Sequence, residues 1–174
     1  MKTVLLIGAV LFLAGCGERS SGGLPPGTTI PPASKILIMP IADAVEPGQP
    51  VAQGTGAGMV AALRDDLSRR GFTPFPTAAA TYELASQEAT KAGFAYVLRA
   101  TIPEYADNAT AWSGKPDILT LDIELLEPGN WHIVSTAYER VGSSAVTLVS
   151  GSPNEMMGRI VRRALDSLLG QRTR

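Results

Sequence analysis

The chain has 174 residues, of which 45% are hydrophobic and 18% charged, and its 15 basic and 16 acidic residues give a formal net charge of −1. No cluster of lysine or arginine is present to neutralise a phosphate backbone, so the composition argues against a nucleic-acid-binding protein. With a single histidine and a single cysteine, the chain lacks the residues for an internal disulfide or for a zinc site of several Cys and His ligands.

The N-terminus carries the pattern of an export signal. Lys2 precedes an apolar run of ten residues, Val4–Leu13, which is followed by small residues. Ten helical residues span roughly 15 Å, about half of a ~30 Å bilayer core, so the run is too short to cross a membrane. The segment Leu13-Ala14-Gly15-Cys16 resembles the lipobox of bacterial lipoproteins, in which a peptidase cuts before a cysteine that carries diacylglycerol. We therefore expect residues 1–15 to be removed and Cys16 to be the lipid-attachment site.

This resemblance to bacterial lipoproteins also implies where the mature protein is located. It implies three acyl chains such as palmitate, and two or more chains hold a protein stably at a membrane. Gly17 follows the cysteine where lipoproteins retained at the inner membrane have Asp, so the resemblance implies an outer-membrane anchor facing the periplasm. The alternative is an ordinary cleaved signal peptide followed by an incidental cysteine.

Residues 16–34 are rich in Pro, Gly, Ser and Thr and contain few apolar side chains, which predicts a disordered tether behind the lipidated cysteine. Such a segment reaches at most ~55 Å when extended and averages roughly 24 Å as a coil. Residues 35–174 have the length of a single domain with its own core.

The first half of this domain predicts alternating strands and helices. Residues 35–41 are a continuous apolar run ended by proline, which is typical of a strand covered on both faces. Residues 55–70 predict an amphipathic helix, stopped by Gly71, with an apolar stripe at Met59, Val60, Leu63 and Leu67. Residues 72–76 contain two prolines and predict an edge strand. Residues 77–92 predict a second helix.

The second half predicts three strands and a last helix. The strands span residues 94–103, 117–127 and 131–141, and the second of them alternates strictly between apolar and polar residues. The last helix begins at Ser152, with Pro153 in its first turn and Glu155 placed for a capping box. The sequence therefore predicts an α/β (α+β) fold in the order β-α-β-α-β-β-β-α, with a mixed sheet and all helices on one face.

Two resemblances add to this prediction. The segment Trp112-Ser113-Gly114-Lys115-Pro116-Asp117 looks like one in an uncharacterised family of proteobacterial lipoproteins, which is defined only as a domain of unknown function. More loosely, the element order and the opening Ile-Leu-Ile-Met-Pro strand are similar to envelope lipoprotein folds such as CsgG, PelC, LpoB and the amino-terminal domain of TolB. These resemblances imply a role in assembly, secretion or activation rather than an enzymatic one.

Candidate catalytic and anion-binding features are weak. His132 is the only histidine, so a Ser-His-Asp triad could be built nowhere else, yet the chain has no G-x-S-x-G elbow. The glycine-rich segment Gly54–Gly58 precedes a helix and is read either as a flexible helix start or as a contact for an anion or a carbonyl group. Asp122 and Glu124 share one strand face, like a glycosidase pair, but that face is expected to be solvated. The sequence thus indicates no enzyme, no cofactor and no metal.

The loop before residue 117 is the best candidate for a binding site. Trp112, Ser113, Lys115 and Asp117 either present an aromatic anchor to a partner or pack the loop onto the sheet. We therefore expect a non-catalytic accessory or assembly factor that binds an envelope protein, and we also consider a homo-oligomer. The alternative is a module that binds a small ligand or a cell-wall fragment, for which an enclosed polar pocket near this loop would speak.

Overall fold

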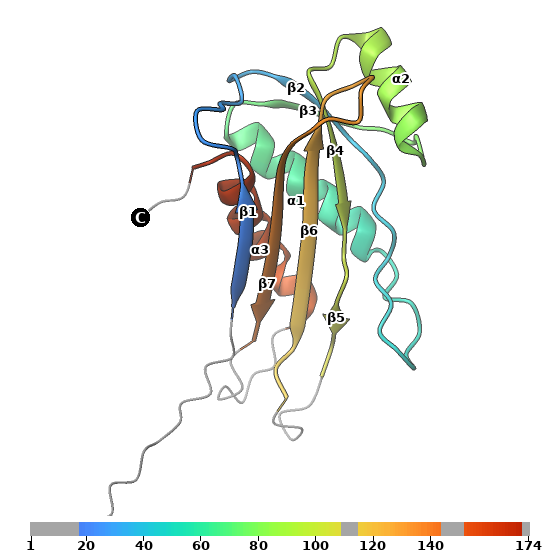
Figure 1. Ribbon diagram of the computed structural model, residues 1–174. Coiled ribbons are helices and arrows are strands. Elements are labelled where there is room, and N and C mark those ends of the chain that lie inside the picture. The colour runs from blue at the N-terminus through green and yellow to red at the C-terminus, as the bar shows by residue number, and fades with distance from the viewer. Residues whose placement is uncertain (1–17, 109–114, 144–151, 172–174) are drawn as a thin grey trace, which may run out of the picture.

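A single mixed β-sheet forms the centre of the computed structural model, which describes residues 18–108, 115–143 and 152–171 (Figure 1). Its strands are β1 (Arg19–Gly23), β2 (Lys35–Ile38), β3 (Thr73–Pro76), β4 (Tyr96–Thr101), β5 (Tyr105–Ala106), β6 (Ile118–Leu126) and β7 (Ile133–Gly142). The strand order is β1-β7-β6-β4-β2-β3, and the short β5 pairs with β6 beyond the end of β4. β2 runs parallel to β3 and β4, whereas the other pairs are antiparallel.

Three helices accompany the sheet: α1 (Thr55–Arg69), α2 (Tyr82–Ala92) and α3 (Pro153–Leu168). The predicted fold class and element order are confirmed, and the structure adds β1 and β5. Within the described part of the chain, no helix is both long enough and apolar enough to span a bilayer.

The main core lies between the sheet and the pair α1 and α3. β6 presents Leu119, Leu121, Ile123 and Leu125 to it, as the predicted alternation requires. α1 contributes Met59, Leu63 and Leu67, each 0% exposed, which lie about one helical turn apart on the same face. The burial of one strand face and one helix stripe against each other is the packing that the sequence pattern predicts.

A second, smaller core shows that the prediction of all helices on one face is wrong. Leu37, Val97 and Leu126 point away from α1 and α3 and pack against Tyr82, Ala85 and Ala89 of α2. β2 is therefore covered on both sides, which explains why its residues form an unbroken apolar run. The Tyr82 hydroxyl donates to the Glu127 carbonyl at 2.5 Å and fastens α2 beside the β6–β7 turn (Figure 1).

The predicted disordered tether is wrong for residues 19–23, which form β1 and pair with β7 from Arg19↔Arg140 to Gly23↔Thr136. Small residues allow this close pairing, because a Cβ atom at Gly22 would lie 2.3 Å from the Thr136 carbonyl oxygen. Further along the same segment, Ile30 packs against the main core. Glycine and serine are typical of flexible segments, whereas here they permit a strand to approach its neighbour.

Helix and strand ends follow local chemistry. α1 is followed by Gly71 at φ 83°, and α2 begins only after Thr81, whose hydroxyl accepts the Leu84 N–H, so the predicted start at residue 77 is too early. Pro153 occupies the first turn of α3, but the Ser152 side chain makes no cap hydrogen bond, so the predicted capping box is not formed.

Candidate functional site

A polar cavity of about 710 Å³ lies at the end of the sheet where β6 begins and β7 ends. Four amide side chains line it, from Gln49, Gln53, Asn108 and Asn154. They come from the loop before α1, the segment after β5 and the first turn of α3. Charged groups of both signs, Glu46, Asp107 and Lys115, share the lining. Amides and mixed charges are groups that recognise a polar ligand through hydrogen bonds.

Backbone and side-chain hydrogen bonds hold the loop between β2 and α1 in place. Ala44 and Ala52 form an isolated antiparallel bridge, with the Ala52 N–H donating to the Ala44 carbonyl at 2.9 Å. The Ala44 N–H donates to the Thr55 hydroxyl oxygen at 2.8 Å. The Asp107 N–H donates to a Glu46 carboxylate oxygen at 3.3 Å, which joins this loop to the segment after β5. One wall of the cavity is thus a fixed part of the fold.

The start of α1 is already occupied by a carboxylate of the same chain. Asp43 accepts the N–H of Gly56 at 2.9 Å and that of Gly54 at 3.0 Å. These two backbone hydrogen bonds hold the pKa of Asp43 below its ordinary value. Gly56 is required here, because a Cβ atom would lie 2.0 Å from the Ile41 carbonyl oxygen. The glycine-rich segment therefore serves an internal helix cap and leaves no position for an external anion.

Acidic groups give the cavity its electrostatic character. The pKa of Asp107 is raised above its ordinary value, mainly by burial. The neighbouring carboxylates of Asp117 and Glu46 raise it further. Lys115 supplies a cation in the same lining. Among the residues that the structure describes, no group of three or more His, Cys, Asp or Glu side chains is placed to hold a metal ion.

The predicted site residues fall into three groups. Lys115 is exposed and lines the cavity. Asp117 is only 2% exposed, and its carboxylate accepts the Asn108 N–H at 2.9 Å while its own N–H donates to the Ser143 hydroxyl oxygen at 2.8 Å. This position suits a residue that joins loop ends better than one that contacts a partner. Trp112 and Ser113 lie outside the described residues.

Sequence reasoning missed most of the cavity. Gln53 and Asn154 are 101 positions apart in the chain, and each belongs to a short polar stretch before or within a helix start. No motif connects them, since they meet only through the packing of α1 beside α3. The one feature of the sequence that could have indicated the cavity is the presence of polar residues at the starts of two helices that pack on the same face of the sheet.

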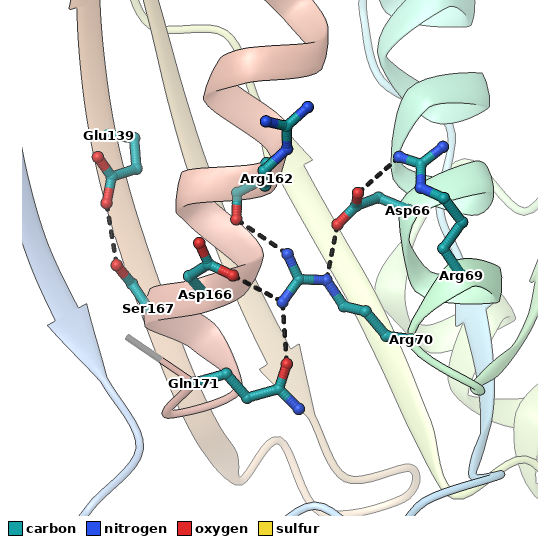
Figure 2. A network of polar contacts seen from close by, with 8 residues as sticks. All are labelled: Asp66, Arg69, Arg70, Glu139, Arg162, Asp166, Ser167 and Gln171. Carbon is teal, nitrogen blue, oxygen red and sulfur yellow. Dashed lines mark hydrogen bonds and ion pairs between the residues drawn. The ribbon is translucent and has the colours of Figure 1, made fainter. Parts of the chain in front are cut away.

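A charged network joins α1 to α3 away from the cavity. Figure 2 shows Arg70 reaching from the end of α1 toward α3, between Asp66 and Asp166. Its guanidinium lies 2.7 Å from Asp66 and 2.8 Å from Asp166. Burial would raise the pKa of Asp66, but the hydrogen bonds from Arg69 and Arg70 outweigh it, so the pKa lies below its ordinary value. The Arg70 guanidinium is thus paired with groups of its own chain, two carboxylates, the Arg162 carbonyl and the Gln171 side chain, so we assign this network to fold stability.

The remaining candidates do not assemble into an active site. Asp122 and Glu124 are half-buried on the face opposite α1 and α3, and Glu124 is paired with Arg99, whose Nε donates at 2.7 Å. His132 precedes β7 instead of lying within a strand, and its Nδ1 lies 3.3 Å from a Glu127 oxygen at the exposed turn. Trp131 is 51% exposed, and its ring packs at a tilt of 43° against that of Tyr82, with the centroids 4.0 Å apart.

Comparison with known proteins relates the chain to others by fold. No family model matches it, and no curated protein sequence matches it. The PelC dodecamer from Paraburkholderia phytofirmans is similar over 88% of this chain and 98% of the PelC chain, with a TM-score of 0.68 and 14% identity. Lipoprotein GNA1162 from Neisseria meningitidis is similar over 76% of this chain and 96% of its own, with a TM-score of 0.50 and 18% identity. The hypothetical protein CT253 from Chlamydia trachomatis is similar over 79% and 94%, with a TM-score of 0.50 and 11% identity.

At these identities the similarity concerns the fold alone. The chain shares the architecture of PelC and of lipoprotein GNA1162, so the predicted looser resemblance to envelope lipoprotein folds is confirmed. The finer resemblance, carried by Trp112 to Asp117, stays a prediction.

Proposed function

We propose that this protein is a lipid-anchored accessory component of the bacterial envelope that acts by binding rather than by catalysis. Cys16 carries the lipid and holds the domain at the outer membrane on its periplasmic side. The observation that carries the proposal is a lipobox-like segment, Leu13-Ala14-Gly15-Cys16, in front of a domain with the fold of PelC and of lipoprotein GNA1162.

Replacing the cysteine tests the anchor. Cys16→Ser should leave an unprocessed precursor without acyl chains, because the sulfur that forms the thioether is absent. Intact mass and outer-membrane fractionation measure the effect against the unaltered protein. A normally processed, membrane-bound Cys16→Ser protein would contradict the proposal.

The partner is a second envelope protein or further copies of this chain. The structure of PelC as a dodecamer supports assembly from identical copies. Crosslinking of the lipidated protein in intact envelopes, followed by mass analysis of the products, distinguishes the two. Trp112→Ala and Lys115→Ala should reduce recovery of the partner while leaving the melting temperature unchanged if the loop before Asp117 binds it. A matched loss of stability would assign the loop to folding instead.

The cavity favours a second candidate function, the binding of a polar small ligand such as a cell-wall fragment. Its amides and mixed charges complement a ligand that is rich in hydroxyl and amide groups. Calorimetry with muropeptides and with N-acetylglucosamine oligomers tests this. Gln53→Ala and Asn154→Ala should weaken binding, whereas Gln87→Ala, an exposed amide on α2, should not. Unchanged affinity in all three variants would remove the cavity as the site.

A further inference from the structure

We infer that the end of the sheet at which β1 begins rests on the surface of the phospholipid bilayer, so that the domain stands at the membrane in one orientation. This inference rests on the proposed lipidation of Cys16. It replaces the flexible tether expected from the sequence with a rigid attachment.

The chain between the lipid and the fold is short. Cys16 precedes Arg19, the first residue of β1, by three positions. Three residues span at most about 11 Å even when fully extended. The acylated residue must sit at the membrane surface, so the start of β1 lies within that distance of it.

β1 is fastened to the domain by side chains as well as by its backbone register. The Ser20 hydroxyl donates to the carboxylate of Glu139, a residue that is 1% exposed. Glu18 pairs with Arg163 of α3, and the Arg163 Nε lies 3.3 Å from Glu139. If β1 detached from the sheet, the buried carboxylate of Glu139 would lose a hydrogen-bond donor, which is unfavourable in free energy. β1 therefore cannot serve as spare tether length.

The strand register identifies the surface that meets the bilayer. Arg19 lies opposite Arg140 near the end of β7, and Gly142 at that end lies opposite Ile118, where β6 begins. The loop between β2 and α1 lies at the same end, as Figure 1 shows, and carries the apolar side chains of Val45 and Val51, 61% and 49% exposed. α2 lies at the opposite end. A lipid anchor beside β1 brings this loop toward the headgroups, where exposed valines are tolerated.

Site-specific labelling measures this orientation. Cys16 is the only cysteine and its sulfur is blocked in the lipidated protein, so a cysteine placed at Val51 or at Leu84 of α2 takes the label alone. Both side chains are about equally exposed, 49% and 53%. The loop that carries Val51 and helix α2 lie toward opposite ends of the sheet (Figure 1). The 9 residues of β6 give that sheet a length of about 30 Å. The probe is a vesicle of phosphatidylethanolamine and phosphatidylglycerol with an acceptor dye on a headgroup lipid.

Energy transfer to the vesicle should be strong from Val51→Cys and weak from Leu84→Cys. A flexible Gly-Ser linker of about 20 residues, spanning roughly 25 Å, inserted between Gly17 and Glu18 should remove most of the difference. Equal transfer from both labels in the unextended protein would overturn the inference. A mass without acyl chains, with no transfer from either label, would show instead that the proposed lipidation has failed and taken the inference with it.

Discussion

Ser20 in β1 donates a hydrogen bond to the carboxylate of Glu139 in β7, 119 positions further along the chain. The same carboxylate accepts the Ser167 hydroxyl of α3 at 2.9 Å (Figure 2). Its second oxygen accepts no hydrogen bond from the described residues. The charge of that oxygen is compensated by the Arg163 guanidinium, whose Nε lies 3.3 Å away. Three segments distant in sequence therefore depend on one buried carboxylate.

Ser20→Ala should lower the free energy of unfolding by about 1.5–3 kcal/mol, because a buried charged acceptor loses one donor. Ser21→Ala is the matched control: its side chain is exposed on the next position of the same strand. Urea denaturation of both variants checks the difference. Equal stability would show that Glu139 does not depend on β1.

Removing β1 entirely should cost more than the single hydroxyl. A protein shortened to begin at Ser34 loses the β1–β7 pairing and the contact of Ile30 with the core. We expect it to unfold at a clearly lower temperature than one beginning at Glu18, whereas the sequence alone predicted an intact domain. Calorimetric melting of the two proteins decides between these outcomes.

Arg70→Ala should destabilise the protein by about 2–4 kcal/mol, because Asp66 and Asp166 would lose their shared partner. Arg64→Ala on the same helix breaks only the exposed pair with Asp65 and should change stability by less than about 1 kcal/mol. Denaturant midpoints measure both. Similar losses in the two variants would mean that the network in Figure 2 contributes little.

The lowered pKa of Asp66 predicts a specific acid dependence. A carboxylate whose pKa is lower in the folded state stabilises the fold above its unfolded pKa, and this contribution is lost as the pH falls through the folded value. The stability difference between the natural protein and Asp66→Asn should therefore be full at neutral pH and shrink below about pH 4. Melting temperatures measured from neutral to acidic pH test it; a constant difference would contradict the assignment.

Leu121→Asp should prevent folding, because Leu121 is 0% exposed against α1 and α3 and an unpaired buried charge costs several kcal/mol. Asp122→Ser is the control on the next residue of β6, whose side chain faces away from those helices. Circular dichroism should show folded protein for the control alone. A folded Leu121→Asp protein would mean that the facing of β6 is wrong.

Much of the architecture could be predicted from the sequence because period and polarity report local burial. The alternation of β6 and the stripe through Met59, Leu63 and Leu67 each point to one buried face. β1 could not be predicted, since Arg19–Gly23 contains no large apolar residue and forms a strand only through its pairing with β7. The unbroken apolar run of β2 indicates that both faces of the strand are covered. A helix is therefore needed on the second face as well, and α2 is the helix that lies there.

The candidate site was harder to predict than the fold. Lys115 was identified because it lies in a distinctive segment, and it does line the cavity. Asp117 was identified for the same reason but is buried. The amides of Gln53 and Asn154 become neighbours only in three dimensions, so no single stretch of sequence signals them. The buried state of Asp66 had one local sign, an arginine four residues later.

The two prolines of β3 limit how copies of this sheet can join. Thr73 and Thr77 donate their N–H groups inward, to Ser34 and Ile38, so the alternation of the strand turns Pro74 and Pro76 toward the outer edge. That edge lacks the donors that an added strand would need. Among the described residues the strand order ends at β1 and β3, and of these two edge strands β1 contains no proline. Two copies that join their sheets through β1 would leave only β3 edges exposed, so this kind of pairing would end at a dimer and could not continue into a fibre.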